Sequence, residues 1–330
     1  MAADRLQQAY ALLWGDALSP MEDDGDAWLS SSTRRRLIAV LLCYVAWRWF
    51  TASAPKRAAP WGPRWLARLA ALGMTKLLSV IGHVPVTSWM GPPENSGFDS
   101  KKQHMVVWHP HGAYTTMAFL HCAIDSIDAK PLSWYCCVAP VLFQLPGLRE
   151  LLQLCNGRSV SAEVVDKLLT AGLTVGIQPG GIPEQLESDH TREIAVFPPR
   201  LGFVRAAMRH GVPLLPAYIF GENQAYGTSA WGRAFTKRIY GLIGFPAVPV
   251  TGQWGLPWLV PKAGPYVHVR WGAPVPVGPP NAKPSDAEVE AVFAAYVTEL
   301  RRVFDAHKGT CLPPEVADKG LLVVKRGSKL

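Results

Sequence analysis

Apolar and polar positions alternate regularly from about residue 103 onward. Short apolar runs bounded by Gly, Pro or polar residues predict buried strands at 106–108, 133–143, 173–178, 213–220 and 266–277. Apolar positions at helical spacing predict helices at 161–171, 200–210 and 285–304. Ser285 and Glu288 form a capping box at the start of the last helix. Strands that alternate with helices indicate an α/β fold, a mixed sheet flanked by helices.

The N-terminal part of the chain has a different pattern. No secretory signal peptide fits, because the first 26 residues are polar and acidic. The apolar run 37–50 follows three arginines, and its 14 residues fall short of the roughly 20 that usually span a membrane. It is therefore either a short tilted span or half of a hairpin that enters one leaflet. Residues 65–89 form a weaker amphipathic stretch, which we interpret as lying at the membrane interface.

These patterns predict four segments. They are a polar leader at 1–32, a membrane-associated helical segment at 33–95, an α/β domain at 96–310 and a C-terminal tail at 311–330. Within the domain, residues 225–264 are rich in Gly, Pro and Trp without clear periodicity, which indicates a lid or a membrane-facing insertion. The alternative is that the two N-terminal apolar segments are core helices of a soluble domain.

The distribution of charge favours the membrane interpretation. The chain of 330 residues has a formal net charge of +8, and residues 27–93 contain nine basic residues and no acidic residue. A basic, apolar segment that contains Trp suits an anionic membrane surface. Nucleic acid is the competing polyanion, but the sequence carries no nucleic-acid-binding motif, so we expect no such partner. The six cysteines form no Cys-x-x-Cys pair, which indicates reduced thiols in a cytosol-facing protein.

Two histidines follow the first predicted strand, in the sequence His109-Pro110-His111-Gly112. Pro110 fixes its own φ and Gly112 lets the backbone turn, so both rings leave the strand at a rigid corner. Reacting groups commonly lie at the C-terminal ends of strands in α/β sheets. Because histidine titrates near neutral pH, either ring could act as a general base, although one of them could be structural.

Three further motifs follow along the chain. They are Pro179-Gly180-Gly181 with Glu184, the run from Arg200 to Arg205, and Phe220-Gly221-Glu222-Asn223. In this order and spacing, the four motifs resemble the type-2 diacylglycerol acyltransferase family, which includes monoacylglycerol and wax-alcohol acyltransferases. The resemblance covers roughly residues 83–308. It implies a catalytic domain similar to glycerolipid acyltransferases, with N-terminal membrane-associated helices.

The resemblance also implies an activity. A member of this family transfers a fatty acyl group from acyl-CoA to diacylglycerol and forms triacylglycerol, and monoacylglycerol or a fatty alcohol is the alternative acceptor. Acyl-CoA is a co-substrate, and we expect no metal and no other cofactor.

The expected partners are acyl-CoA, the lipid alcohol, a membrane and a second copy of the chain. The expected location is the cytosolic face of the endoplasmic reticulum or a lipid droplet. The terminal Ser328-Lys329-Leu330 matches a peroxisomal address, which is the alternative.

One of the two histidines would take the proton from the acceptor alcohol. Related acyltransferases carry an Asp five residues after their histidine, but Tyr114 and Thr116 occupy those positions here. The orienting carboxylate must therefore come from elsewhere, and Glu184 and Glu222 are the candidates. Asn223 is grouped with Glu222 as a binding residue. The alternatives are a solvated loop acid for Glu184 and a simple turn for Glu222 and Asn223.

Binding roles follow for five more residues. Backbone N–H groups at Gly112, or at Gly180 and Gly181, could stabilise the thioester oxyanion. Arg200 and Arg205 could hold the phosphates of CoA. A solvated helix face is the alternative for the two arginines.

Two other classes of function remain open from the residues alone. His-x-His at a strand end is also a metal-ligand arrangement, as in a metal-dependent hydrolase. His210 and His268 are further histidines, but His210 closes a predicted helix and no Asp lies at a convincing strand end. A non-catalytic membrane-binding protein is the second alternative, but it would leave the histidine pair and the Gly-Gly turn without a task.

Overall fold

The computed structural model describes residues 31–81, 88–115, 134–244, 246, 248–257, 260–262 and 267–326. Contacts divide the chain into two compact units, Met1–Ser53 and Ala54–Leu330. Most of the expected leader and the C-terminal tripeptide lie outside the described residues. The second unit includes the residues on both sides of positions 95 and 310.

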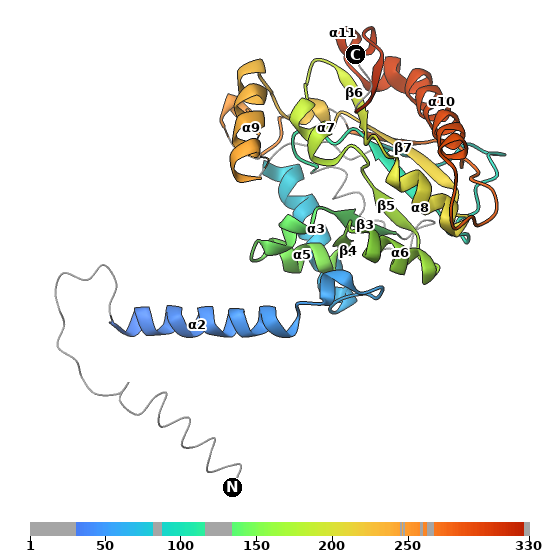
Figure 1. Ribbon diagram of the computed structural model, residues 1–330. Coiled ribbons are helices and arrows are strands. Elements are labelled where there is room, and N and C mark those ends of the chain that lie inside the picture. Colours follow the sequence, from blue (N-terminus) through green and yellow to red (C-terminus); the bar gives the residue numbers. More distant parts are fainter. Residues whose placement is uncertain are drawn as a thin grey trace. The chain divides into compact units, whose positions relative to one another are not determined.

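The first unit contains one described helix, α2 (Ser31–Phe50), seen at the blue end of the chain in Figure 1. The helix includes the three arginines, so it is longer than the apolar run alone. Segment Ser32–Lys56 is the one candidate, among the described residues, that is long and apolar enough to cross a membrane. This segment indicates association with a membrane. The large apolar side chains of α2 are exposed at Leu37, Ile38, Val40, Leu41, Leu42, Val45, Trp47 and Trp49.

The second unit is built on a mixed sheet of seven strands in the order β1-β8-β7-β2-β5-β3-β4. Neighbouring strands run parallel except for β7 and β8, which run antiparallel, so the predicted mixed α/β sheet is confirmed. The strands are β1 (Ser88–Met90), β2 (Met105–His109), β3 (Tyr135–Val138), β4 (Gly157–Ser159), β5 (Val175–Ile177), β7 (Leu214–Phe220) and β8 (His268–Trp271).

Helices pack against this sheet, and a small second sheet lies beside it (Figure 1). The second sheet pairs β6 (Glu193–Phe197) with β9 (Leu321–Lys325) in parallel. The α-helices of this unit are α3 (Arg64–Ile81), α5 (Leu148–Leu154), α6 (Ala162–Thr170), α7 (Gly181–Glu187), α8 (Gly202–His210), α9 (Ala230–Ile243), α10 (Asp286–Cys311) and α11 (Pro314–Ala317). Short 3-10 helices are η2 (Ala54–Lys56), η3 (Pro140–Gln144), η4 (Asn223–Ala225) and η5 (Gln253–Gly255).

Strand β2 is buried on both faces, as is usual for parallel strands covered by helices. Its alternate side chains enter two separate apolar clusters. Met105 and Val107 join the main core, which includes side chains of α6, α8 and α10. Val106 and Trp108 join a second cluster, where Trp108 packs edge-on against Trp134 with ring centroids 4.8 Å apart. The strand end at His109 is therefore fixed by packing from two sides.

Several elements differ from their predicted bounds. The predicted strand 133–143 ends at Val138, because Pro140 lacks an N–H and starts a 3-10 helix. Within the predicted strand 266–277, residues 268–271 form β8. The aperiodic segment 225–264 contains α9, which Ser229 caps by accepting a hydrogen bond from the Gly232 N–H at 3.0 Å. The expected C-terminal tail contains α11 and β9.

Arg158 connects the sheet to the segment that follows α2 in the chain. Its buried guanidinium donates from Nε to the carbonyl of Arg57 at 2.8 Å and from a terminal nitrogen to the carbonyl of Gly157 at 2.7 Å. It also donates to the carbonyl of Ala59 and lies over the ring of Tyr135. Burial lowers the pKa of the Arg158 guanidinium. The cation is thus satisfied by neutral carbonyls and holds residues 57–59 against the sheet.

Candidate active site

The candidate site lies where β2, β5 and β7 end side by side. His109 is the last residue of β2, Gln178 follows β5, and Gly221 to Asn223 follow β7. Parallel strands bring their carboxyl ends to one edge of a sheet, and ligands of α/β proteins commonly bind at that edge. The structure therefore brings three of the four sequence motifs to one place.

The carboxylate of Glu184, on α7, contacts both histidines. Its Oε2 lies 3.1 Å and its Oε1 lies 3.2 Å from Nδ1 of His109. Oε1 accepts a hydrogen bond from the backbone N–H of His111 at 2.7 Å, and Oε2 accepts from that of Val196 at 2.9 Å. A carboxylate oxygen that is ionised can only accept, so Nδ1 of His109 carries the proton. Glu184 is 1% exposed and thus fixes, from the protein interior, the turn from His109 to Gly112, which is the histidine corner.

Gly180 and Gly112 allow this arrangement. A Cβ at Gly180 would lie 2.0 Å from Oε2 of Glu184, so only glycine leaves space for the carboxylate. Gly112 has a φ of +68°, and a Cβ there would lie 2.9 Å from Cγ of Glu222. Two of the motif glycines therefore serve close approaches of glutamate side chains to the corner. The N–H of Gly181 donates to the carbonyl of Gln178 at 3.1 Å, which commits it to the turn.

The two histidines lie in different environments. His109 is fully buried, and its ring packs against Phe197 with centroids 4.8 Å apart. Its Nε2 is buried and finds no hydrogen-bond partner among the described residues. His111 is half-buried, with Nδ1 3.1 Å from the carbonyl oxygen of Gly112. The two residues therefore differ in exposure, since His111 is half-buried and His109 is fully buried.

Two residues that the sequence motifs did not include contact the His111 region. The hydroxyl of Thr115 lies 3.2 Å from Nδ1 of His111 and 3.1 Å from Oε1 of Gln178. Nε2 of Gln178 donates to the carbonyl of Pro110 at 3.2 Å. Burial lowers the pKa of His111, although the charge of Glu184 acts in the opposite direction. The sequence could have indicated Gln178, because this polar residue comes directly after a predicted buried strand.

Glu222 and Asn223 lie on the loop after β7, and both are buried. Glu222 reaches the corner at Gly112, as described above, whereas Asn223 faces a second polar group. Its Nδ2 donates to Oε2 of Glu193 at 2.9 Å, and its Oδ1 accepts from the Ser188 hydroxyl at 3.3 Å. Asn223 therefore connects the loop to β6 rather than to the histidines.

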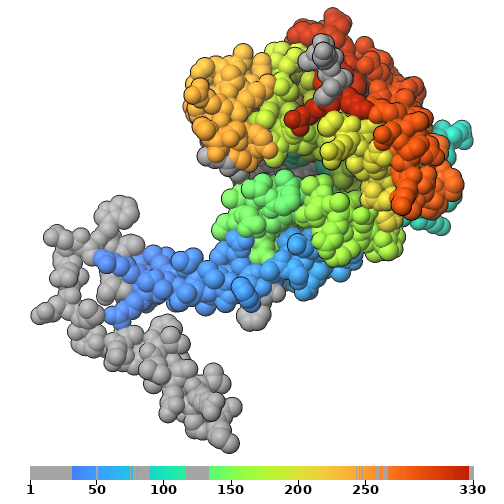
Figure 2. All heavy atoms as spheres, viewed as in Figure 1, coloured from blue at the N-terminus to red at the C-terminus, as the bar shows by residue number. Residues whose placement is uncertain are grey.

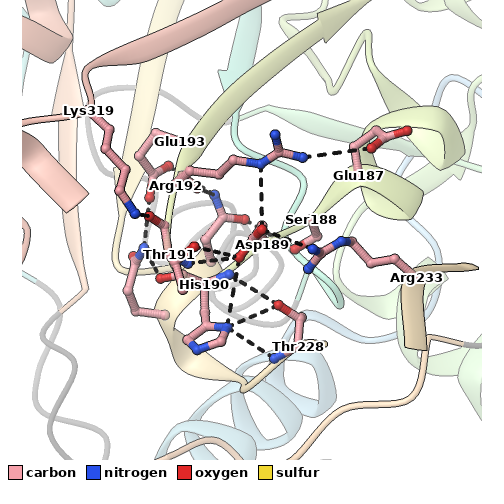
Figure 3. A network of polar contacts seen from close by, with 12 residues as sticks. Glu187, Ser188, Asp189, His190, Thr191, Arg192, Glu193, Thr228, Arg233 and Lys319 are labelled. Carbon is pink, nitrogen blue, oxygen red and sulfur yellow. Dashed lines mark hydrogen bonds and ion pairs between the residues drawn. The ribbon is translucent and has the colours of Figure 1, made fainter. Parts of the chain in front are cut away.

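Glu193 is the centre of a buried polar group beside the site. The hydroxyl of Tyr218 donates to its Oε2 at 2.7 Å, and Nε2 of Gln224 donates to its Oε1 at 2.8 Å. Burial raises the pKa of the Glu193 carboxyl to about 7, against the effect of these donors. Figure 3 shows how the residues before it, from Glu187 to Arg192, link α7 and β6 to Thr228 and Arg233.

The two arginines proposed for CoA lie on α8 or directly before it. Arg205 donates to the carbonyl of Pro284 at 3.1 Å and pairs with Asp286 at the start of α10. Its Nε donates to the carbonyl of Arg200 at 3.2 Å. The structure therefore places the Arg205 side chain against the start of α10. Among the described residues, no group of three or more His, Cys, Asp or Glu side chains could hold a metal ion.

A family model described as diacylglycerol acyltransferase matches residues 33–320. This chain belongs to the diacylglycerol acyltransferase family. The resemblance read from the four motifs is thus confirmed, and the match extends further toward the N-terminus than the motifs did.

Individual relatives share about a third of their aligned residues or fewer with this chain. Diacylglycerol O-acyltransferase 2 from Xenopus tropicalis is 32% identical over 226 residues, which are 63% of this chain and 61% of that protein. The Bos taurus protein of the same name is 29% identical over 294 residues, 82% of this chain and 76% of that protein. Human 2-acylglycerol O-acyltransferase 3 is 32% identical over 62% of this chain and 64% of that protein. The chain therefore spans less than two thirds of the length of the frog and human relatives.

Among solved structures, the crystal structure of 1-acyl-sn-glycerophosphate acyltransferase PlsC from Thermotoga maritima aligns with 17% identity and a TM-score of 0.38. The alignment covers 83% of this chain and 98% of that chain.

Proposed function

We propose that this protein is a membrane-bound acyltransferase that transfers a fatty acyl group from acyl-CoA to diacylglycerol and forms triacylglycerol. Membership of the diacylglycerol acyltransferase family supports the reaction class. The observation that carries the proposal is the half-buried His111 at a corner fixed by Glu184. Monoacylglycerol and a fatty alcohol are the alternative acceptors, since relatives named for these substrates match the chain to a similar degree.

His111 is the general base in this proposal. A base must come within about 3 Å of the proton that it removes, and the fully buried ring of His109 offers no such access. The carbonyl oxygen of Gly112 can only accept, so Nδ1 of His111 is its donor and Nε2 keeps its lone pair, 3.4 Å from the hydroxyl oxygen of Thr115. The lowered pKa keeps this ring neutral at physiological pH, as a base requires.

His109 and Glu184 act as positioning residues. Neither side chain meets solvent, but together they fix the backbone from which His111 projects. Thr115 and Gln178 restrain the same corner from the side of β5. Catalytic groups need support of this kind, because a small displacement of a base lowers its efficiency strongly.

The reaction follows from these roles. Nε2 of His111 takes the proton of the acceptor hydroxyl while the oxygen attacks the thioester carbonyl carbon. The negative charge that develops on the carbonyl oxygen is stabilised by backbone donors, for which the N–H of Gly112 is our candidate. The tetrahedral intermediate then expels the CoA sulfur, which receives the proton from the imidazolium. A thioester is already activated, so no covalent enzyme intermediate is needed.

The site of action is part of the proposal. The exposed apolar surface of α2 and the basic N-terminal region support attachment to the cytosolic face of the endoplasmic reticulum, or to a lipid droplet. The C-terminal Ser-Lys-Leu supports the peroxisome as the alternative. Acyl-CoA and a lipid alcohol are the proposed small-molecule partners, and self-association is a further expectation.

The experiment is an assay of the full chain in microsomes with labelled acyl-CoA and separate diacylglycerol, monoacylglycerol and fatty-alcohol acceptors. We expect labelled triacylglycerol as the main product and a loss of about 10²–10⁴ in turnover for His111→Ala. His307→Ala, a change of the same type on α10, is the matched control and should keep wild-type turnover. A wax ester or diacylglycerol as the main product would reassign the acceptor. Wild-type turnover in His111→Ala would exclude the proposed base.

A further inference from the structure

A cavity lies on the outer side of the β6–β9 sheet, between α7 and α9. Its volume is about 560 Å³, within the usual range for small-molecule pockets. Figure 2 shows the bordering segments on one side of the molecule, with residues 181–197 in yellow-green, α9 in orange and the last strand in red. Apolar side chains form its floor and one wall: Ile194, Val196, Leu322, Val324, Pro183 and Leu186.

This cavity is separate from the histidine corner. Side chains alternate across β6, and Glu193, Ala195 and Phe197 point toward the core and the site. Ile194 and Val196 point the other way and line the cavity. Strand β6 therefore stands between the cavity and the His109 ring, and the proposed acyl transfer does not use the cavity.

Cations border the apolar floor. The lining includes Arg192, Lys237 and Arg326 but a single carboxylate, Glu187. Glu187 lies 2.5 Å from Lys237 and 3.9 Å from Arg192, and Arg192 also lies 3.6 Å from Asp189, so each of these two cations has a carboxylate partner within the protein. Arg326 is exposed and forms no ion pair with another described residue. Arg326 is thus the cation of this lining that is available to a ligand.

We propose that this cavity binds a long-chain fatty acid as its carboxylate. The apolar floor suits a single hydrocarbon chain, and Arg326 suits a single negative charge. The headgroup of acyl-CoA carries several phosphate charges, which one available cation does not match. A neutral lipid would leave Arg326 without a role. Charge complementarity therefore selects the free fatty acid over both substrates of the proposed reaction.

Helix α7 couples this cavity to the site. Pro183, Leu186 and Glu187 face the cavity, while Glu184 and Gln185 on the same helix face the corner. Gln185 donates to the carbonyl of Ala113 at 2.8 Å. A chain bound against one face of α7 would thus stabilise the position of the Glu184 carboxylate on the other face.

The experiment is photo-crosslinking of the full chain, in neutral-lipid nanodiscs, with a palmitate analogue that carries a diazirine. We expect labelling on peptides that contain 183–196 or 321–326, and competition by palmitate but much weaker competition by hexadecanol. Leu322→Glu places a carboxylate on the floor at a side chain that is 45% exposed, and it should reduce labelling at least tenfold. Arg326→Glu should reduce it about threefold or more.

Matched controls separate the site from general effects of charge. Arg301→Glu reverses another exposed arginine, and Leu145→Glu changes another partly exposed leucine, so both should leave labelling unchanged. His111→Ala should also leave labelling unchanged, even where it abolishes acyl transfer, so that the two proposals fail independently.

Three results would overturn the proposal. Equal competition by hexadecanol would mean that the carboxylate is not recognised. Displacement of the label by palmitoyl-CoA at lower concentration than by palmitate would mean that the cavity serves the acyl donor. Labelling that occurs only after removal of residues 327–330 would mean that the end of the chain, and not a lipid, occupies the cavity.

Discussion

The carboxylate of Glu184 lies 3.1 Å from Nδ1 of His109, and both side chains are almost completely buried. Such a pair is costly to break, because a buried polar group that loses its partner keeps its desolvation penalty. The same carboxylate also accepts the backbone N–H of His111. One side chain therefore determines the geometry of the whole histidine corner.

Glu184→Gln should reduce both turnover and stability. The amide keeps the size of the side chain, but it brings N–H donors against Nδ1 of His109 or the N–H groups of His111 and Val196. We expect a loss of about 1–3 kcal/mol in unfolding free energy and at least a tenfold loss of turnover. The measurements are thermal unfolding and the acyltransferase assay. Glu163→Gln, at an exposed ion pair on α6, is the control and should change neither quantity. A stable and fully active Glu184→Gln variant would show that neither turnover nor stability depends on the carboxylate of Glu184.

The pH dependence of catalysis tests the assignment of His111 as the base. A general base must be neutral, and burial lowers the pKa of His111 below its usual 6.5. Turnover should therefore stay constant as pH falls toward 6.5 and decrease only at lower pH, as His111 becomes protonated. The measurement is a pH profile of kcat from pH 5 to 8, with a stability check at each pH. A decrease that begins above pH 7 would contradict the assignment.

Glu193 makes stability depend on pH in the opposite sense to most acids. Its folded pKa of about 7 lies above the ordinary 4.5, so the folded state binds the proton more tightly than the unfolded state does. Its contribution is fully present below pH 4.5 and is lost as pH rises through 7, on the order of 3 kcal/mol. Glu193→Gln should flatten the change in unfolding temperature between pH 5 and 8. Glu315→Gln, on the exposed side of α11, should leave the slope unchanged. If the unfolding temperature of Glu193→Gln changes with pH as in the wild type, Glu193 is not the cause of the pH dependence.

Arg158→Met should loosen the segment that joins α2 to the sheet. The methionine fills similar space but leaves the carbonyls of Arg57, Ala59 and Gly157 without their donor. We expect a loss of about 2–4 kcal/mol in unfolding free energy and faster proteolysis within residues 54–62. Arg301→Met, at an exposed arginine of α10, is the control for loss of charge alone. Equal protease resistance in the two variants would mean that Arg158 does not hold this segment.

The sequence predicted the strands that are buried throughout and the helices that have one apolar face. Strands β2 and β7 are uniformly buried, and α6, α8 and α10 keep one apolar face, so their patterns were readable. Helix α9 was missed because exposed Trp231, Phe235 and Leu242 share its outer face with cations. The helix therefore lacks the usual separation between an apolar buried face and a polar exposed face. The β6–β9 pair was missed because its partners lie more than 120 residues apart in the chain.

The candidate site was predictable where a motif marks both the backbone and the chemistry. The histidine corner and Glu184 stood next to the prolines and glycines that shape their turns, and the structure brings them together. Thr115 and Gln178 carry no charge and belong to no motif, so only the fold reveals their contacts. The ion pair between Arg205 and Asp286 is likewise a contact that only the fold reveals. Roles in catalysis remain predictions for all of these residues.

The pairing of β9 with β6 has a consequence for how the protein matures. Strand β6 donates its Val196 N–H to Glu184, but its partner β9 follows more than 120 residues later in the chain. During synthesis, β6 therefore stays without this neighbour until β9 has been made. A chain that is truncated before Leu321 would lack the strand that pairs with Val196 beside Glu184.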